Sequence, residues 1–156
     1  SESASAEIFL DRTPPTINSF SINANSEWAT SLKVTLTSDI DDAFEAKYSN
    51  NSSTLRNIGW EKYNPQRPEW TLIPNDGDKT VFAVFRDHAG NTTNVVNASI
   101  KLDMTPPKGN LIINGGMKVT NHPEGLVKIQ IEHDDDVVGM QITNLPKFEN
   151  VELIPL

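Results

Sequence analysis

The sequence contains no cysteine, no long apolar run and few basic residues. The absence of cysteine excludes disulfides, thiolate zinc sites and cysteine nucleophiles. The longest apolar runs span only a few residues, so no segment is predicted to cross a bilayer. Thirteen Lys and Arg residues stand against 21 Asp and Glu residues, giving a net charge of −8 and a pI near 4.8. Nucleic acids and anionic membranes need a cationic surface, so we expect neither as a partner.

Sustained helical spacing is also missing from the 156 residues, and hydrophobic residues recur at every second position instead. This alternation is clear at 32–36 and again at 127–131, and it is typical of half-buried β-strands. Short strands separated by turn residues predict a sandwich or barrel. In the first two thirds of the chain we expect strands at 17–22, 31–37, 43–49, 55–60, 69–73, 79–86 and 94–102.

An internal repeat divides the chain. The segment LDRTPP at 10–15 returns as LDMTPP at 102–107, and each copy is followed by a short strand, a period-2 strand and an acidic run. The prolines fix φ and lack an N–H, so strand pairing must stop at these hinges. We predict a terminal or donor strand at 1–12, a complete sandwich at 13–104, and a truncated or incomplete second sandwich at 105–156. The proline pairs are Pro14 with Pro15 and Pro106 with Pro107.

The two copies are unequal, because residues 105–156 contain no counterpart of the strands expected at 79–86 and 94–102. Residues 7–11 (EIFLD) in turn read like the end of the last strand, 99–103 (SIKLD). Three explanations follow. The chain is a fragment of a longer array, or the second half is a short sandwich, or residues 7–10 of one copy complete the second half of another by strand addition.

The stretch NDGDKTVFAVFRDHAGN at 75–91, followed by LDMTPP, carries a family resemblance. Together with YSN at 48–50, WEKY at 60–63 and WTL at 70–72, it resembles the tandem Ig-like or fibronectin type III-like repeats of bacteria and archaea. Such repeats occur in surface proteins, adhesins, filaments, extracellular enzymes and phage appendages. The resemblance implies an all-β fold of tandem antiparallel sandwiches. It also implies a location outside the cell, on the cell surface or on a virion, with other repeats or subunits as partners.

The residues of this stretch also have local explanations. Asp76 and Gly77 form a turn pair that tolerates positive φ. Asp87 and Asn91 bracket a tight turn in which Gly90 supplies flexibility, and their side chains are expected to bond nearby backbone N–H groups. The three tryptophans at 28, 60 and 70 are expected to supply large apolar areas to the core.

Catalytic residues are not evident. The three histidines, His88, His122 and His133, stand in turn or loop segments, and no phosphate loop, zinc helix or nucleophile elbow is present. We therefore expect no enzymatic activity and no organic cofactor.

Calcium is the best chemical hypothesis. Carboxylates gather in two acidic runs that we expect to be loops, and Ca²⁺ takes six to eight hard oxygen ligands. A second place for a cation is the hinges, where Asp11 and Asp103 could converge with Asp87 and Asn91. The alternative is that these side chains only cap turns. The acidic runs are Asp39, Asp41 and Asp42, and Asp134, Asp135 and Asp136.

Two features of the sequence point to glycans, one as a covalent modification and one as a surface ligand. Asn50, Asn51, Asn91 and Asn97 begin glycosylation sequons. Trp60, Tyr63 and Trp70 are candidates for an aromatic platform that stacks on sugars, although the tryptophans have an alternative place in the core.

We thus predict a non-enzymatic extracellular structural or adhesive module. The alternatives are a carbohydrate-binding accessory module of a secreted enzyme and a strand-exchanged subunit of an extracellular fibre.

Overall fold

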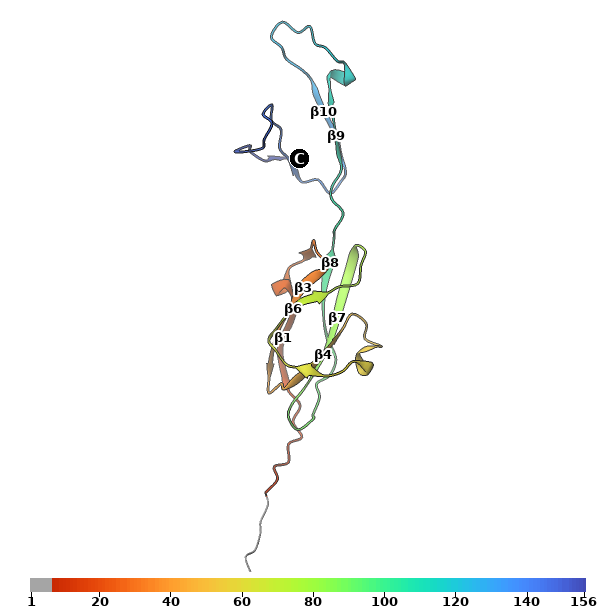
Figure 1. Ribbon diagram of the computed structural model, residues 1–156, viewed down its shortest axis with the longest axis vertical. Coiled ribbons are helices and arrows are strands. Elements are labelled where there is room, and N and C mark those ends of the chain that lie inside the picture. Colours follow the sequence, from red (N-terminus) through yellow and green to blue (C-terminus); the bar gives the residue numbers. More distant parts are fainter. Residues whose placement is uncertain (1–6) are drawn as a thin grey trace, which may run out of the picture. The chain divides into compact units, whose positions relative to one another are not determined.

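The computed structural model describes residues 7–156, and the chain divides into two units, Ser1–Met104 and Thr105–Leu156 (Figure 1). Among the described residues, no helix has the length and apolar character needed to span a membrane. Residues 1–6 of the expected terminal strand lie outside the described part, and residues 7–15 belong to no strand.

The first unit consists of two sheets. One has the order β1-β3-β6, and the other has the order β2-β8-β7-β4-β5. All neighbouring strands are antiparallel except β2 and β8, which pair in parallel. This confirms the predicted all-β antiparallel sandwich. The strands are β1 (Thr16–Ile22), β2 (Trp28–Ala29), β3 (Lys33–Asp41), β4 (Glu45–Ser49), β5 (Glu61–Lys62), β6 (Gln66–Thr71), β7 (Gly77–Arg86) and β8 (Val96–Leu102).

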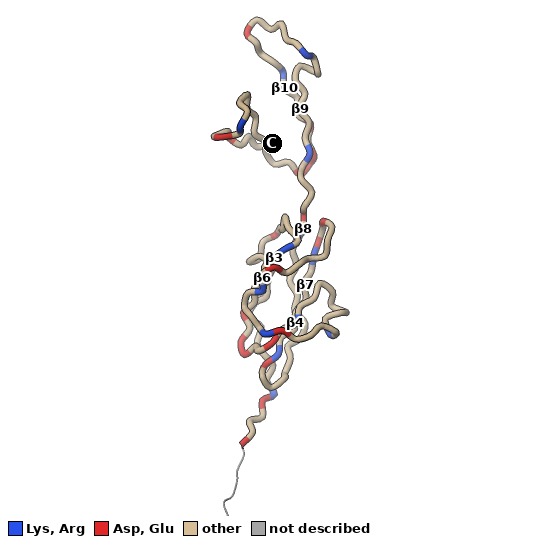
Figure 2. The backbone as a smooth tube through the Cα atoms, viewed as in Figure 1, with Lys and Arg blue, Asp and Glu red and all other residues tan. Residues whose placement is uncertain are grey.

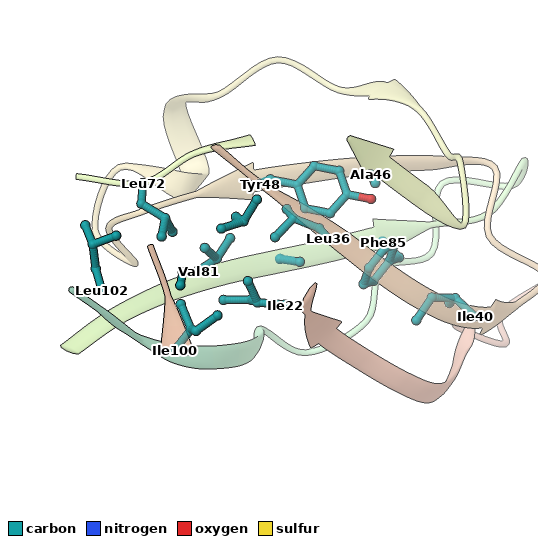
Figure 3. Close-up of a cluster of buried hydrophobic side chains, with 13 residues drawn as sticks. Ile22, Leu36, Ile40, Ala46, Tyr48, Leu72, Val81, Phe85, Ile100 and Leu102 are labelled. Atoms are coloured by element: carbon teal, nitrogen blue, oxygen red, sulfur yellow. The ribbon is translucent and has the colours of Figure 1, made fainter. Parts of the chain in front are cut away.

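The core lies between these sheets and follows from the period-2 patterns (Figure 3). In β7 the inward residues Val81, Ala83 and Phe85 are fully buried, while the alternate residues are half-buried on the outer face. The opposite sheet contributes Ile22 and Leu36. Burying each large side chain stabilises the sandwich by about 1.5–3 kcal/mol. β7 is therefore a central strand covered on both faces, as predicted.

Two expectations about the first unit are wrong. The predicted strand at 55–60 is a 3-10 turn, η2 (Leu55–Asn57), and the next strand is β5. Asn51 explains the turn, because its Oδ1 accepts bonds from the backbone N–H and the hydroxyl of Ser53 at 2.9 Å each, and such local bonds compete with strand pairing. Trp28 and Trp60 are also not core residues, since half of the Trp28 surface is exposed and Trp60 does not pack against the buried cluster.

The second unit contains two separate strand pairs and no closed sandwich within residues 105–156. β9 (Gly109–Ile113) pairs with β10 (Ile129–His133), and β11 (Gly139–Met140) pairs with β12 (Ile154–Pro155), both antiparallel. None of the residues 105–156 is buried. Their hydrophobic side chains therefore have no core to occupy in this unit.

The first strand of each unit ends in the same kind of turn. In the first unit β1 runs into the 3-10 turn η1 (Asn23–Asn25), and the Oδ1 atom of Asn23 accepts a bond from the backbone N–H of Thr35 at 2.9 Å. In the second, β9 runs into η3 (Asn114–Gly116), and the Oδ1 atom of Asn114 accepts from the N–H of Lys128 at 2.7 Å. An asparagine with positive φ starts both turns. The two turns therefore share the same asparagine geometry.

Candidate functional site

Three carboxylates meet at one end of the first unit. Asp11 lies in the segment before β1, Asp42 directly follows β3, and Asp87 directly follows β7. One oxygen of each lies within 4.8 Å of the others. The cluster joins residues far apart in the sequence, two of them named as hinge or turn residues and one as part of an acidic run.

The backbone around the cluster is fixed by local bonds. Asp42 has a φ of 63°, which Asp tolerates better than most residues and which ends β3. The backbone N–H of Asn91 donates to Asp87 Oδ1 at 2.9 Å, and Gly90 supplies a φ of 94° in this turn. The Nδ2 atom of Asn91 donates to Asp87 Oδ2 at 2.9 Å and to the Asp11 carbonyl at 3.2 Å. Asn91 thereby ties the entering segment to the turn.

Asp87 is the buried member of the cluster. Burial alone would raise the pKa of the Asp87 carboxyl. Hydrogen bonds from the Asn91 side chain and from the backbone N–H groups of Asn91, Gly90 and Ala89 outweigh burial, so the pKa lies below its usual value. The folded turn therefore favours the ionised form of Asp87.

The chemistry of this cluster is limited to binding a cation or capping turns. Three carboxylates offer the hard oxygens that Ca²⁺ prefers. Asp87 already accepts bonds on both oxygens, and Asp11 Oδ1 accepts one from the backbone N–H of Thr13 at 2.9 Å. The acidic run at 39–42 does not form a loop as expected, because only Asp42 follows the strand. Asp39 and Asp41 lie in β3, paired with Ser19 and Thr16, and are exposed on either side of the buried Ile40.

The second acidic run does not gather in the same way. Asp134 Oδ2 accepts a bond from the backbone N–H of Lys108 at 3.1 Å, while Asp135 and Asp136 are exposed. Within residues 7–156, no group of three potential metal ligands includes any of the three. At the second hinge the backbone N–H of Asp103 donates to the Ala29 carbonyl at 2.9 Å in the first unit, and Pro106 and Pro107 are exposed.

The three rings of the predicted sugar platform are not brought together. Tyr63 and Trp70 face the core. Tyr63 packs edge-on against Phe85, and the ring centroids of Trp70 and Tyr48 lie 6.0 Å apart. Trp60 lies instead beside outward-pointing residues of the β4-β7 sheet. The rings do not form one platform, because Trp60 and Tyr63 lie on opposite faces of that sheet and Trp70 belongs to β6 of the other sheet.

Trp60 contacts two cations, an arrangement that sequence reasoning missed. Lys47 Nζ lies 4.6 Å and the Arg86 guanidinium carbon 4.3 Å from the centroid of its ring. The signal was present in the sequence, since Lys47 and Arg86 are the polar positions of two alternating strands.

The sequons differ in how far their asparagines are engaged. Asn50 binds the Thr71 carbonyl and the Trp70 indole, and Asn91 binds the Asp11–Asp87 cluster. Asn51 caps its own turn, and Asn97 is exposed on β8. Modification at Asn97 would disturb the fold least, so it is the sequon we still expect to carry a glycan in a host that glycosylates.

The histidines have local contacts. The His88 ring stacks on Phe44 at a centroid distance of 3.5 Å. His122 Nδ1 accepts from the backbone N–H of Glu124, and His133 Nδ1 contacts the Asp134 carbonyl.

Comparisons with known proteins give one structural likeness. No protein-family model matches the chain, and no curated protein matches it. The chain is similar to the crystal structure of FN3tt, with 18% identity over 60% of this chain and 99% of that chain, and a TM-score of 0.45. The fold assignment therefore rests on the strand order and the buried faces of the two sheets described above.

Proposed function

We propose that this protein is a non-enzymatic extracellular structural or adhesive module, acting as a spacer or display domain of a surface protein, filament or phage appendage. The observation that carries the proposal is the recurrence of one turn, η1 in the first unit and η3 in the second, with the same asparagine bond. Repetition of a module adds length and mechanical strength without adding a reaction.

The first unit is suited to bearing tension. The chain enters it through the segment before β1 and leaves through β8, at opposite ends of the unit (Figure 1). β8 pairs antiparallel with β7 from Gly77 opposite Leu102 to Ala83 opposite Val96. Pulling the ends apart loads this ladder along the strands, so its hydrogen bonds and the core packing beneath them resist together.

Two measurements test the proposal. Antibodies against the first unit should label intact source cells or particles without permeabilisation. Pulling single chains should give a force peak followed by an extension of about 30 nm, because residues 16–102 then lengthen to ~3.5 Å each. Labelling that requires lysis would contradict the extracellular assignment, and extension without a force peak would contradict the mechanical one.

A strand-exchanged fibre subunit is the second candidate. The observation that favours it is exposed apolar surface on both possible partners: Ile8 and Phe9 are more than nine-tenths exposed, and Leu111, Ile113 and Ile129 are at least two-fifths exposed. It ranks second because a donor strand in the place of β8 needs a neighbour like β7, with which β8 pairs in the first unit. Residues 105–156 offer no counterpart of β7.

Size-exclusion chromatography over a range of concentrations tests this second candidate. Strand exchange gives larger species as concentration rises, and deletion of residues 1–11 should abolish them. A monomer of 17.3 kDa at all concentrations, unchanged by the deletion, would remove the candidate.

A further inference from the structure

A cationic pocket lies on the outer face of the β4-β7 sheet of the first unit. It has a volume of about 330 Å³ and is bordered by Lys47 from β4, Arg56 from η2 and Trp60 before β5. This volume is at the lower end of the range for small-molecule sites. No acidic residue lines the pocket, although acidic residues outnumber basic ones 21 to 13 in the chain and charges of both signs are spread along it (Figure 2).

The two cations of the pocket are uncompensated. In the described part of the chain, neither Lys47 nor Arg56 forms an ion pair. Arg86, the other cation near the Trp60 ring, differs because its Nε donates to Glu45 Oε2 at 2.6 Å. Lys47 and Arg56 therefore attract an anion from outside the chain, and Arg86 serves to orient Trp60.

The rest of the lining suits a compact ligand that is partly apolar. Trp60 and Val95 form apolar walls, and the cations at 4.6 and 4.3 Å from the Trp60 centroid fix the ring in place. Ser52 and Thr92 add hydroxyl groups, which both donate and accept hydrogen bonds. A ligand with an apolar C–H face, several hydroxyls and one carboxylate matches all three kinds of lining.

We infer that this pocket binds a carboxylated sugar residue of an acidic polysaccharide. The inference rests on the adhesive role proposed above and names its ligand class. An acidic peptide fits less well, because it could not add main-chain pairing with a sheet edge here, a common source of affinity for extended peptides. The pocket opens on a sheet face, where the backbone groups of β4 and β7 already pair with each other.

The test is a titration of the ¹⁵N-labelled 156-residue chain with trigalacturonate, followed by NMR. The Trp60 indole N–H and the amides of Lys47 and Arg56 should shift and saturate at millimolar concentrations or below. The methyl-esterified trimer, which has the same shape without the charges, should bind at least tenfold more weakly. Raising the salt from 50 to 500 mM should weaken the binding of the charged trimer only.

Variants separate the pocket from the rest of the surface. The double variant K47Q/R56Q should lower the affinity at least tenfold, and R56Q alone should lower it severalfold while leaving the fold unchanged, since Arg56 is exposed. The matched control is K101Q, which removes a cation 5.0 Å from the Trp28 ring centroid, outside this pocket. K101Q should bind within twofold of the original chain.

Several results would overturn the inference. These are no saturable shift at 10 mM trigalacturonate, equal binding of the methyl-esterified trimer, an equal loss in K101Q, or tighter binding of hexaglutamate, which would assign the pocket to an acidic peptide. Surface labelling of intact cells does not depend on sugars, so failure here leaves the extracellular structural role standing.

Discussion

The first hairpins of the two units are built alike but differ in how far their side chains are buried. Ile22 faces Leu36 across β1 and β3, just as Ile113 faces Ile129 across β9 and β10. The first pair is 2% and 1% exposed, whereas the second is 45% and 43% exposed. Strand pairing and turn chemistry are therefore encoded within each hairpin, but burial is not.

The difference arises from what covers the hairpin. In the first unit β7 and β8 lie opposite it and supply Val81, Phe85 and Ile100. The second unit supplies only the short pair β11 and β12, which matches β4 and β5 in its order after the hairpin. A two-stranded ribbon alone is marginally stable, and a covered apolar face is what makes it durable.

Matched truncations of the two hairpins give the largest expected effect. Leu36→Ala should cost the first unit about 2–5 kcal/mol of unfolding free energy, because it leaves a cavity in a packed core. Ile129→Ala should cost less than about 1 kcal/mol, because its side chain is already half in water. Urea unfolding followed by tryptophan fluorescence reports on the first unit, which contains all three tryptophans. To follow the second unit, amide hydrogen exchange of β9 and β10 is needed. Comparable losses from the two truncations would show that the second hairpin is covered after all.

The shared turn gives a smaller contrast. Asn23→Ala removes the acceptor for the Thr35 N–H and places alanine at a φ of 45°, so we expect a loss of about 1–2 kcal/mol. Asn23→Asp retains an acceptor oxygen and should preserve most of the stability. Asn114→Ala should leave the urea midpoint of the first unit unchanged while increasing hydrogen exchange at Lys128. A first-unit midpoint that moves with Asn114→Ala would show that the two units unfold together.

The sequence was informative where one local rule acts alone. Alternation located β3 and β7, and the Asp87–Asn91 turn followed from the preference of Asp, Gly and Asn for such turns. It was less informative where rules compete. Residues 55–60 contain the apolar residues expected of a strand, but the polar bonds of residues 51–54 close a turn first.

The candidate sites show the same limit. Sequence patterns place a side chain on one face of a strand but do not say which strands from elsewhere meet it. Asp42, Asp11 and Asp87 converge because β3 and β7 end beside the entering segment. Tyr63 and Trp60, three residues apart, separate onto opposite faces of one sheet. The convergence of the three carboxylates is not contained in the spacing of the residues, whereas the separation of Tyr63 and Trp60 follows from strand alternation.

Calcium should sharpen the difference between the two acidic regions. We expect Ca²⁺ to bind the Asp11–Asp42–Asp87 cluster and raise the melting temperature of the first unit. At ten times its dissociation constant, the ligand contributes about 1.4 kcal/mol, or roughly 5–10 °C for a sandwich of this size. Calorimetry with CaCl₂ and then with EDTA measures the shift. Asp42→Asn should abolish it, and Asp39→Asn, at an exposed strand position, should not. A midpoint that ignores both calcium and chelator would assign the three carboxylates to turn capping alone.

Acid should reveal the smallest contrast, because it acts through one turn of the first unit. The pKa of Asp87 is lowered in the folded state, so its ionised form contributes stability above the usual carboxyl pKa of about 3.9. That contribution is lost as the pH falls below this value and through the lowered pKa. Between pH 5 and pH 2 the urea midpoint of Asp87→Asn should therefore fall less steeply than that of the original chain, although the variant starts lower. The matched control is Asp41→Asn, at an exposed position of β3. Equal slopes for Asp87→Asn and the original chain would mean that the bonds from Asn91 hold the carboxyl equally well in its protonated form.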